Sequence, residues 1–183
     1  MTELRQTRSE CAAPSIDGPA APTDSCDMPT REPEITIAAE DPRQPEVRRL
    51  IALSDAAMQA LYPAESNHLV DVDALAAPGA VFLVARGGGQ GLGSIAFRII
   101  APGHAEMKRL FVRSEARGAG LGRRLLDALE DSARRQGVGR ISLETGIRQP
   151  EAIGLYRTCG YRECPPFGSY AADPLSLFMT KRL

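Results

Sequence analysis

The sequence is poor in several residue types that are typical of particular functional classes. It has no tryptophan, only two histidines and only four cysteines, and its positive and negative charges nearly cancel. Nucleic-acid binders usually carry a basic excess, and 22 Lys and Arg residues against 23 Asp and Glu residues leave none, so no nucleic-acid partner is expected. His68 and His104 lie far apart, and no CxxC pair occurs among the cysteines, which are Cys11, Cys26, Cys159 and Cys164. This spacing predicts neither a metal site nor a disulfide framework.

Long apolar runs are also absent. No uninterrupted apolar stretch reaches the length needed to span a bilayer, and the N-terminal segment has no apolar leader region. We therefore expect a cytoplasmic protein with no membrane partner. Residues 1–33 are rich in polar residues and proline without apolar periodicity, which predicts a disordered N-terminal extension. The 43% apolar share and the remaining length suit one folded domain over residues 34–183.

The first half of this domain has the pattern of a strand, a helix and a hairpin. A short strand is expected over residues 34–38, and a helix over residues 45–61, where an initial proline precedes apolar residues at helical spacing. The apolar runs 81–85 and 91–100 flank a glycine-rich turn and predict an antiparallel hairpin. A third strand is expected over residues 105–112.

The second half alternates helices and strands. An apolar stripe at helical spacing predicts a helix; its residues are Leu121, Leu125, Leu126, Leu129 and Ala133. Gly137 is expected to end this helix in a left-handed cap. A strand over 140–145, a helix over 150–159 and a last strand over 175–181 follow. Because a helix joins strands 105–112 and 140–145, we expect a parallel pair with a right-handed crossover. Residues 64–78 are expected to be irregular or to form a short helix. With this helix in parentheses, the order β-α-(α)-β-β-β-α-β-α-β predicts a mixed α/β domain.

A glycine-rich loop, residues 117–122 (RGAGLG), lies between a predicted strand and a predicted helix. Its glycines let the backbone turn tightly and approach a ligand, and the first amides of the helix lack intrahelical partners. With the positive end of the helix dipole and the side chains of Arg117 and Arg123, these amides predict a phosphate site. The spacing does not fit a dinucleotide fingerprint, whose last glycine would fall on Arg123 or Leu125. It does not fit a P-loop either, because no Gly-Lys-Ser/Thr ending is present.

Three segments together resemble the GNAT (GCN5-related N-acetyltransferase) superfamily. The motif Arg117-x-x-Gly120-x-Gly122 is similar to the family's Q/R-x-x-G-x-G/A loop, and the preceding segment 106–112 (EMKRLFV) belongs to the resemblance. Residues 152–161 (AIGLYRTCGY) are similar to the family's A-x-x-L-Y-x-x-x-G-F segment. The expected element order also agrees, so the resemblance covers nearly all of the folded part.

The resemblance implies an α/β fold of the GNAT type, with a mixed, mostly antiparallel sheet, a splayed central pair of parallel strands and flanking helices. It implies direct transfer of an acetyl group from acetyl-CoA, as co-substrate, to an amine, with no metal. The pattern of the central strand adds an independent expectation. Met107 and Leu110 are both apolar but stand at odd spacing, which predicts a β-bulge between them.

The resemblance also implies the contacts of acetyl-CoA. The pantetheine arm is expected to lie beside strand 105–112, and the glycine loop is expected to hold the pyrophosphate. The Leu110 N–H is the candidate for polarising the thioester carbonyl. Gln149 stands where the family often has Asn. The expected cofactor-binding residues are Leu110, Phe111, Val112, Arg117, Gly118, Ala119, Gly120, Leu121, Gly122, Arg123 and Gln149.

Two catalytic residues are implied. Tyr156 resembles the family tyrosine that protonates the departing CoA thiolate, and a phenol with a pKa near ~10 remains protonated at neutral pH. Glu106 stands where some histone-type members carry a general base. Glu144, on the neighbouring predicted strand, and a water molecule remain alternative bases.

The acceptor is expected to be a small amine or an amino-acid-like molecule, while a protein amine and a homodimer stay open. Its expected contacts are Glu65, Ser66, Asn67, His68 and Tyr170. Arg98 and Lys108 leave room for an acceptor that bears a carboxylate. Two alternatives to an enzyme remain, namely a catalytically silent acetyl-CoA sensor and an interaction module on the same fold.

Overall fold

The computed structural model describes residues 34–64 and 70–183. The expected disordered extension and the expected acceptor contacts Glu65, Ser66, Asn67 and His68 lie outside the described residues. The elements, in chain order, are β1 (Thr36–Ala39), α1 (Pro45–Gln59), α2 (Val72–Leu75), β2 (Ala80–Gly87), β3 (Gln90–Ala101), β4 (His104–Val112), the 3₁₀ turn η2 (Ser114–Ala116), α3 (Leu121–Arg135), β5 (Arg140–Gly146), α4 (Pro150–Thr158), β6 (Arg162–Glu163) and β7 (Ser176–Arg182).

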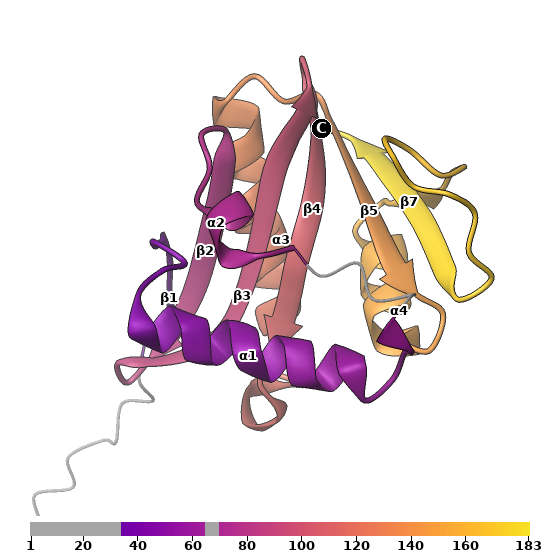
Figure 1. Ribbon diagram of the computed structural model, residues 1–183. Helices are drawn as coiled ribbons and strands as arrows, with labels where there is room; N and C mark the ends of the chain where they lie inside the picture. The colour runs from indigo at the N-terminus through magenta and orange to yellow at the C-terminus, as the bar shows by residue number, and fades with distance from the viewer. Residues whose placement is uncertain (1–33, 65–69) are drawn as a thin grey trace, which may run out of the picture. The chain divides into compact units, whose positions relative to one another are not determined.

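The strands form one seven-stranded sheet in the order β1-β2-β3-β4-β5-β7-β6. All neighbours are antiparallel except β4 and β5, which are parallel as the sequence predicts. The pairing of β4 with β5 runs only from His104 opposite Arg140 to Met107 opposite Leu143. Beyond that point the two strands diverge, as Figure 1 shows. The expected fold, with its splayed parallel pair, is confirmed.

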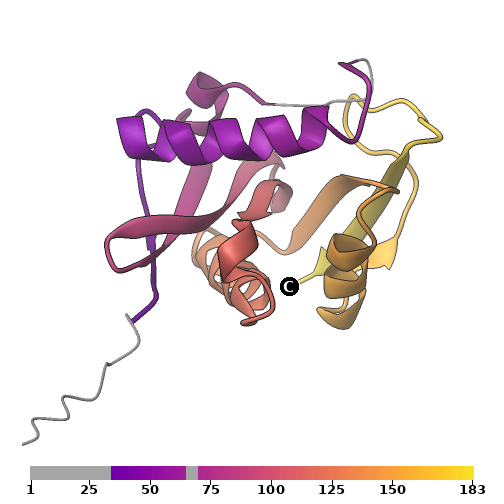
Figure 2. The same ribbon diagram turned by 90° about the horizontal axis from the view of Figure 1, so that it is seen from below.

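Helices cover both faces of this sheet. Figure 2 shows α1 on one side and α3 with α4 on the other. On the first side α1 and α2 pack on alternate residues of β2 and β3, through a buried cluster of Val47, Leu50, Ile51, Leu75, Phe82, Val84 and Ala96. On the other side the predicted stripe of α3 is buried, and each fully buried leucine there contributes about 2 kcal/mol of stability. The sheet positions both helix layers around the point where β4 and β5 separate.

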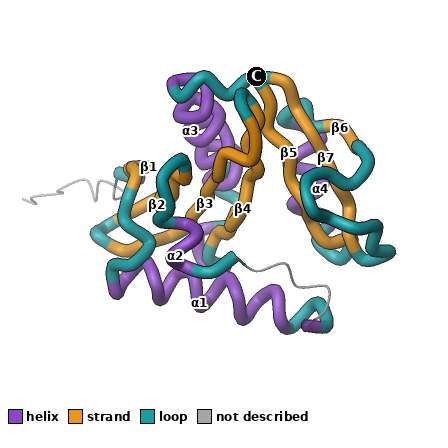
Figure 3. The backbone as a smooth tube through the Cα atoms, turned by 45° about the horizontal axis from the view of Figure 1, so that its top comes forward, coloured by secondary structure: helices purple, strands orange, loops and turns teal. Residues whose placement is uncertain are grey.

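The observed bounds agree closely with the expected ones, with three differences. Helix α1 ends at Gln59, before the expected residue 61, because the amides of Leu61 and Tyr62 both bond the Met58 carbonyl and tighten the chain ahead of Pro63. The short strand β6 and the turn η2 were not expected, since neither is long enough to show a periodicity. Figure 3 shows β6 at the outer edge beside β7, next to the long loop that precedes β7.

The predicted left-handed cap of α3 is confirmed, since Gly137 has a φ of +75°. Within the described part of the chain, no helix is long and apolar enough to cross a membrane.

Candidate active site

Two cavities open where β4 and β5 separate. The larger, of about 620 Å³, is bordered by the end of β4, the glycine loop and the starts of α3 and α4. The smaller, of about 100 Å³, lies between α1, the middle of β4 and the end of β5. Met58, Leu110 and Gln149 line both cavities, so the two spaces adjoin at these residues.

The larger cavity collects the residues that the sequence analysis assigned to acetyl-CoA. All of them line it except Ala119. Gly118 and Gly120 take left-handed conformations, with φ of +82° and +74°, and a Cβ on either would meet no atom within 4 Å. Open space therefore adjoins the loop, and backbone conformation requires the two glycines.

The start of α3 suits an anion. Its N-cap residue, Gly120, provides no side-chain cap, and the first turn has no acidic residue. The first amides of a helix lack intrahelical acceptors, and the helix dipole makes this end positive. Arg117 and Arg123 line the same cavity, although Arg123 also lies 3.3 Å from the Asp127 carboxylate. These groups fit a pyrophosphate.

Gly122 allows α3 and α4 to approach each other. A Cβ at this position would come within 3.0 Å of the Leu155 side chain, closer than nearly all real contacts. Both residues line the larger cavity. No cluster of three or more His, Cys, Asp or Glu residues suited to a metal occurs among the described residues.

A β-bulge interrupts β4 beside the cavities, as the sequence predicts. Ser94 of β3 pairs with Phe111 and Ala96 pairs with Lys108, so two residues of β4 oppose the single residue between them. One of the two, Arg109, has a φ of +59°. The other, Leu110, borders both cavities.

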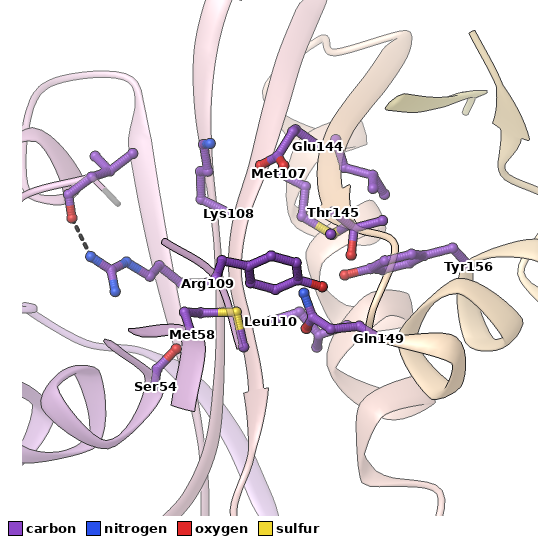
Figure 4. A pocket seen from close by; sticks show the side chains of 14 residues that line it. Ser54, Met58, Met107, Lys108, Arg109, Leu110, Glu144, Thr145, Gln149 and Tyr156 are labelled. Atoms are coloured by element: carbon purple, nitrogen blue, oxygen red, sulfur yellow. Dashed lines mark hydrogen bonds between the residues drawn. The ribbon is translucent and has the colours of Figure 1, made fainter. Parts of the chain in front are cut away.

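The Arg109 side chain is buried. Its guanidinium forms an ion pair with Asp55 of α1. It also donates a hydrogen bond to the carbonyl of Val70, drawn as a dashed line from Arg109 in Figure 4. Burial lowers the pKa of Arg109 below its usual value. Within the described residues, the buried Nε of Arg109 has no acceptor.

Tyr156 lies on the inner face of α4 and lines the smaller cavity. Figure 4 shows its hydroxyl directed into the pocket, toward the side where Thr145 and Gln149 lie. Burial raises the pKa of Tyr156 well above its usual value, and the nearby Glu144 raises it further. The phenol therefore stays protonated across the physiological pH range and keeps a hydrogen to donate in a hydrogen bond.

Glu106 lies in a buried cluster of charged groups and lines neither cavity. It is 1% exposed, and its Oε2 accepts a hydrogen bond from Arg98 Nε at 2.7 Å. Its Oε1 accepts a hydrogen bond from the Tyr170 hydroxyl at 2.6 Å and lies 3.2 Å from Lys108 Nζ. Burial alone would raise the pKa of Glu106, but Lys108, Tyr170 and Arg98 outweigh it and lower the pKa.

Glu144 is differently placed. It lies on β5, directly after the last residue paired with β4, and it lines the smaller cavity. Its Oε1 accepts a hydrogen bond from the Ser176 hydroxyl at 2.7 Å. Figure 4 shows its carboxylate and the Lys108 ammonium on the same side of the pocket. Of the two candidate bases, Glu144 is the one that borders a cavity.

Sequence reasoning missed several residues of the smaller cavity. Tyr62 belongs to the segment after the first helix, which the GNAT resemblance places at the acceptor pocket, whereas Arg109 was expected only as part of a strand. Tyr62, Arg109, Thr145 and the α1 residues Ser54 and Met58 all border this cavity. The helical spacing of Ser54 and Met58 and the strand alternation that includes Thr145 indicated core positions. Only the tertiary arrangement reveals that these residues border a pocket.

Comparison with known proteins agrees with this geometry. The sequence profile of the Acetyltransferase (GNAT) family matches residues 47–161. An IAA acetyltransferase of Azospirillum brasilense is 49% identical over 152 residues, which cover 82% of this chain and 99% of the relative.

Solved structures give the same fold. A protein of Klebsiella pneumoniae, solved as a candidate acyl-CoA N-acyltransferase, is 35% identical in sequence and superposes with a TM-score of 0.70. The match covers 81% of this chain and 97% of the Klebsiella chain. A GNAT family acetyltransferase of Elizabethkingia anophelis with acetyl-CoA bound shares the fold at 16% identity, with a TM-score of 0.61 and coverage of 81% and 98%. The chain belongs to the Acetyltransferase (GNAT) family and is an N-acetyltransferase.

Proposed function

We propose that this enzyme transfers an acetyl group from acetyl-CoA to the amine of a small, amino-acid-like acceptor by direct attack when both molecules are bound. The observation that carries the proposal is the junction of the two cavities. At that junction Leu110 and Gln149 border both spaces, and Tyr156 and Glu144 border the smaller one. A donor and an acceptor can therefore meet without a covalent enzyme intermediate.

Acetyl-CoA is assigned to the larger cavity. The amides at the start of α3 and the side chains of Arg117 and Arg123 would bind its pyrophosphate. Backbone groups of Leu110 and Val112 would bind the pantetheine arm, because β4 has no strand partner on the β5 side beyond Met107. Gln149 would contact the same arm from the start of α4.

The Leu110 N–H is assigned to the thioester carbonyl oxygen. An amide aimed at an oxygen that gains negative charge during attack lowers the barrier, and in a pocket that excludes water the effect is large. The position of Leu110 between the two cavities supports this role.

Glu144 is assigned as the group that takes the proton from the acceptor amine. A base must lie within hydrogen-bond reach of the amine, and Glu144 lines the acceptor cavity. Glu106, the first choice from the sequence, has both oxygens engaged and a lowered pKa. We assign Glu106 the role of holding Tyr170 and the Lys108 ammonium, which lines the pocket, in place.

Tyr156 is assigned as the acid. The amine nitrogen forms a bond to the acetyl carbon, the carbon–sulfur bond breaks, and the sulfur takes the electron pair. Tyr156 gives its proton to that sulfur and regains one from solvent, while the proton lost by the amine goes to Glu144. The products are an acetylated amine and free CoA thiol, so protons and electrons balance.

The smaller cavity supports a small acceptor. Its volume of about 100 Å³ suits a compact molecule, and its lining combines the Glu144 carboxylate with the Lys108 cation. A carboxylate attracts an ammonium group and a cation attracts a carboxylate, which together favour an acceptor that carries both. The name of the Azospirillum relative specifies IAA, which therefore belongs among the compounds tested.

The test measures CoA thiol release by the purified chain with acetyl-CoA and a panel of amines, amino acids, amino-terminal peptides and IAA. The expected result is release that depends on an amino acid or a related amine. Calorimetry of CoA alone provides the control. Binding of CoA without turnover on any acceptor would favour a silent sensor, and an absence of CoA binding would overturn the proposal.

A further inference from the structure

Arg109 holds a conformation that residues with a Cβ rarely adopt. Among the described residues it is the only one other than glycine with a positive φ, at +59°. The left-handed region brings the Cβ close to the following carbonyl, so such a residue persists only where its surroundings fix it. The contacts around Arg109 must therefore hold its backbone in this conformation.

Two sets of contacts fix this residue. On the backbone, the Ser94 hydroxyl, which is fully buried, donates a hydrogen bond of 3.1 Å to the Arg109 carbonyl. The Arg109 side chain is 6% exposed, and the Asp55 carboxylate and the Val70 carbonyl hold its guanidinium. Rotating Arg109 into a normal strand conformation would break the second set, because its side chain would leave this pocket.

The conformation of Arg109 sets the direction of the next peptide group. That peptide carries the Leu110 N–H, which the proposed function assigns to the thioester. In a regular strand successive amides alternate between the two edges, and the bulge changes that alternation at this point. The direction of the Leu110 amide is thus coupled to the Arg109 side chain.

The same side chain also joins two parts of the acceptor cavity. Asp55 follows Ser54 on α1, and Val70 precedes α2, and both Ser54 and Val70 line the smaller cavity. One guanidinium therefore ties the wall of the acceptor cavity to the bulge. We propose that Arg109 is a positioning residue, whose buried ion pair with Asp55 holds the β4 bulge so that the Leu110 amide faces the thioester. This inference rests on the proposed function.

The test separates the ion pair from the backbone conformation. Asp55→Asn removes the charge of the partner, Arg109→Ala removes the guanidinium, and Arg109→Gly removes the guanidinium but allows a positive φ freely. We expect Asp55→Asn and Arg109→Ala to lower kcat by roughly 10- to 100-fold, with an unchanged Kd for CoA in calorimetry. Arg109→Gly should keep a higher kcat than Arg109→Ala.

A double variant tests the coupling. Once the guanidinium is gone, Asp55 has no role toward the bulge, so Asp55→Asn added to Arg109→Gly should change kcat by less than about twofold. The matched control is Asp131→Asn, which breaks an exposed ion pair with Arg134 on α3, remote from both cavities. It should leave kcat unchanged.

The outcomes that overturn the inference are specific. They are a kcat for Asp55→Asn equal to that of Asp131→Asn, or equal losses in Arg109→Ala and Arg109→Gly. The amide resonance of Leu110 in NMR spectra gives a readout that needs no turnover, and Asp55→Asn should shift it. If the wild-type chain bound CoA but transferred no acetyl group to any acceptor, the proposed function would fail. A Leu110 amide resonance that Asp55→Asn leaves unshifted would separately overturn the positioning role of Arg109.

Discussion

The ring of Tyr62 lies so close to Gly146 that a Cβ on the glycine would overlap it. The Tyr62 hydroxyl accepts a hydrogen bond of 2.8 Å from the Arg148 amide, and the Arg148 guanidinium donates one of 2.7 Å to the Leu61 carbonyl. These contacts fasten the end of α1 to the end of β5, on the far side of the gap from β4. Tyr62 thus forms part of the wall of the smaller cavity.

Substituting Gly146 with alanine should displace the Tyr62 ring. We expect a loss of about 1 to 3 kcal/mol in the free energy of unfolding, the usual cost of overpacking, and a higher KM for the acceptor. Thermal unfolding and steady-state kinetics measure the two effects. The control is Gly154→Ala in α4, where a Cβ meets no atom within 4 Å and alanine favours the helix. If Gly146→Ala unfolds no earlier than Gly154→Ala, Tyr62 does not depend on this glycine.

Tyr156→Phe should lower kcat by about 10² to 10⁴-fold, because the departing thiolate loses its proton donor. The Kd for CoA, measured by calorimetry, should stay the same. Tyr161→Phe is the matched control, since Tyr161 is also a buried tyrosine but lies outside both cavities. Equal rates for the wild type and Tyr156→Phe would show that another group protonates the sulfur.

Glu144→Gln and Glu106→Gln should separate the two candidate bases. We expect Glu144→Gln to reduce kcat/KM by about 10²-fold or more and to change the shape of its pH profile. Glu106→Gln should keep the shape of the wild-type profile. The measurement is kcat/KM against pH for the three proteins. The opposite pattern, with the altered profile in Glu106→Gln, would return the base role to Glu106.

Glu106→Gln should instead reduce stability. Removing this buried charge, which faces Arg98 and Lys108, should cost about 3 kcal/mol in the free energy of unfolding. Glu163→Gln, which breaks an exposed ion pair with Arg157, should cost less than about 1 kcal/mol. Chemical denaturation at neutral pH measures both, and equal costs would contradict the prediction.

The pH dependence of stability gives Glu106 a second signature. Its pKa is lowered in the folded protein from a usual value of 4.5, so the folded state binds this proton less readily than the unfolded chain. The stabilisation it provides is therefore complete above that usual value and is lost as the pH falls through the lower folded pKa. The wild type should lose stability more steeply than Glu106→Gln in that acidic range. Parallel curves would contradict this expectation.

Gly120→Ala should weaken CoA binding by about tenfold, because a Cβ at a φ of +74° costs about 1 kcal/mol or more and disturbs the start of α3. Gly89 provides a close control, with a φ of +80°, open space around its Cβ position and a place in the β2–β3 turn outside both cavities. Gly89→Ala should lower stability by a similar amount while leaving the Kd for CoA unchanged. Calorimetry distinguishes the two.

The sequence predicts most elements of the fold and the cofactor loop, because these depend on local spacing. The stripe of α3, the cap at Gly137 and the odd spacing of Met107 and Leu110 each reflect a pattern within one segment. The contacts of Arg109 with Asp55 and of Tyr62 with Gly146 join residues more than 50 positions apart. No local pattern encodes such pairs, and the same holds for the cluster around Glu106. The acceptor side was therefore the part that the sequence left open.

Met58, Leu110 and Gln149 are the residues that line both cavities, and this overlap has a consequence for altering the enzyme. With acetyl-CoA in the larger cavity and the acceptor in the smaller one, as we propose, a change at one of the three would affect the binding of both. Changes elsewhere in the smaller cavity, at Ser54 or Thr145, can alter acceptor choice while the affinity for acetyl-CoA is retained. Selection in nature or in the laboratory can therefore diversify acceptors one position at a time on an unchanged donor site.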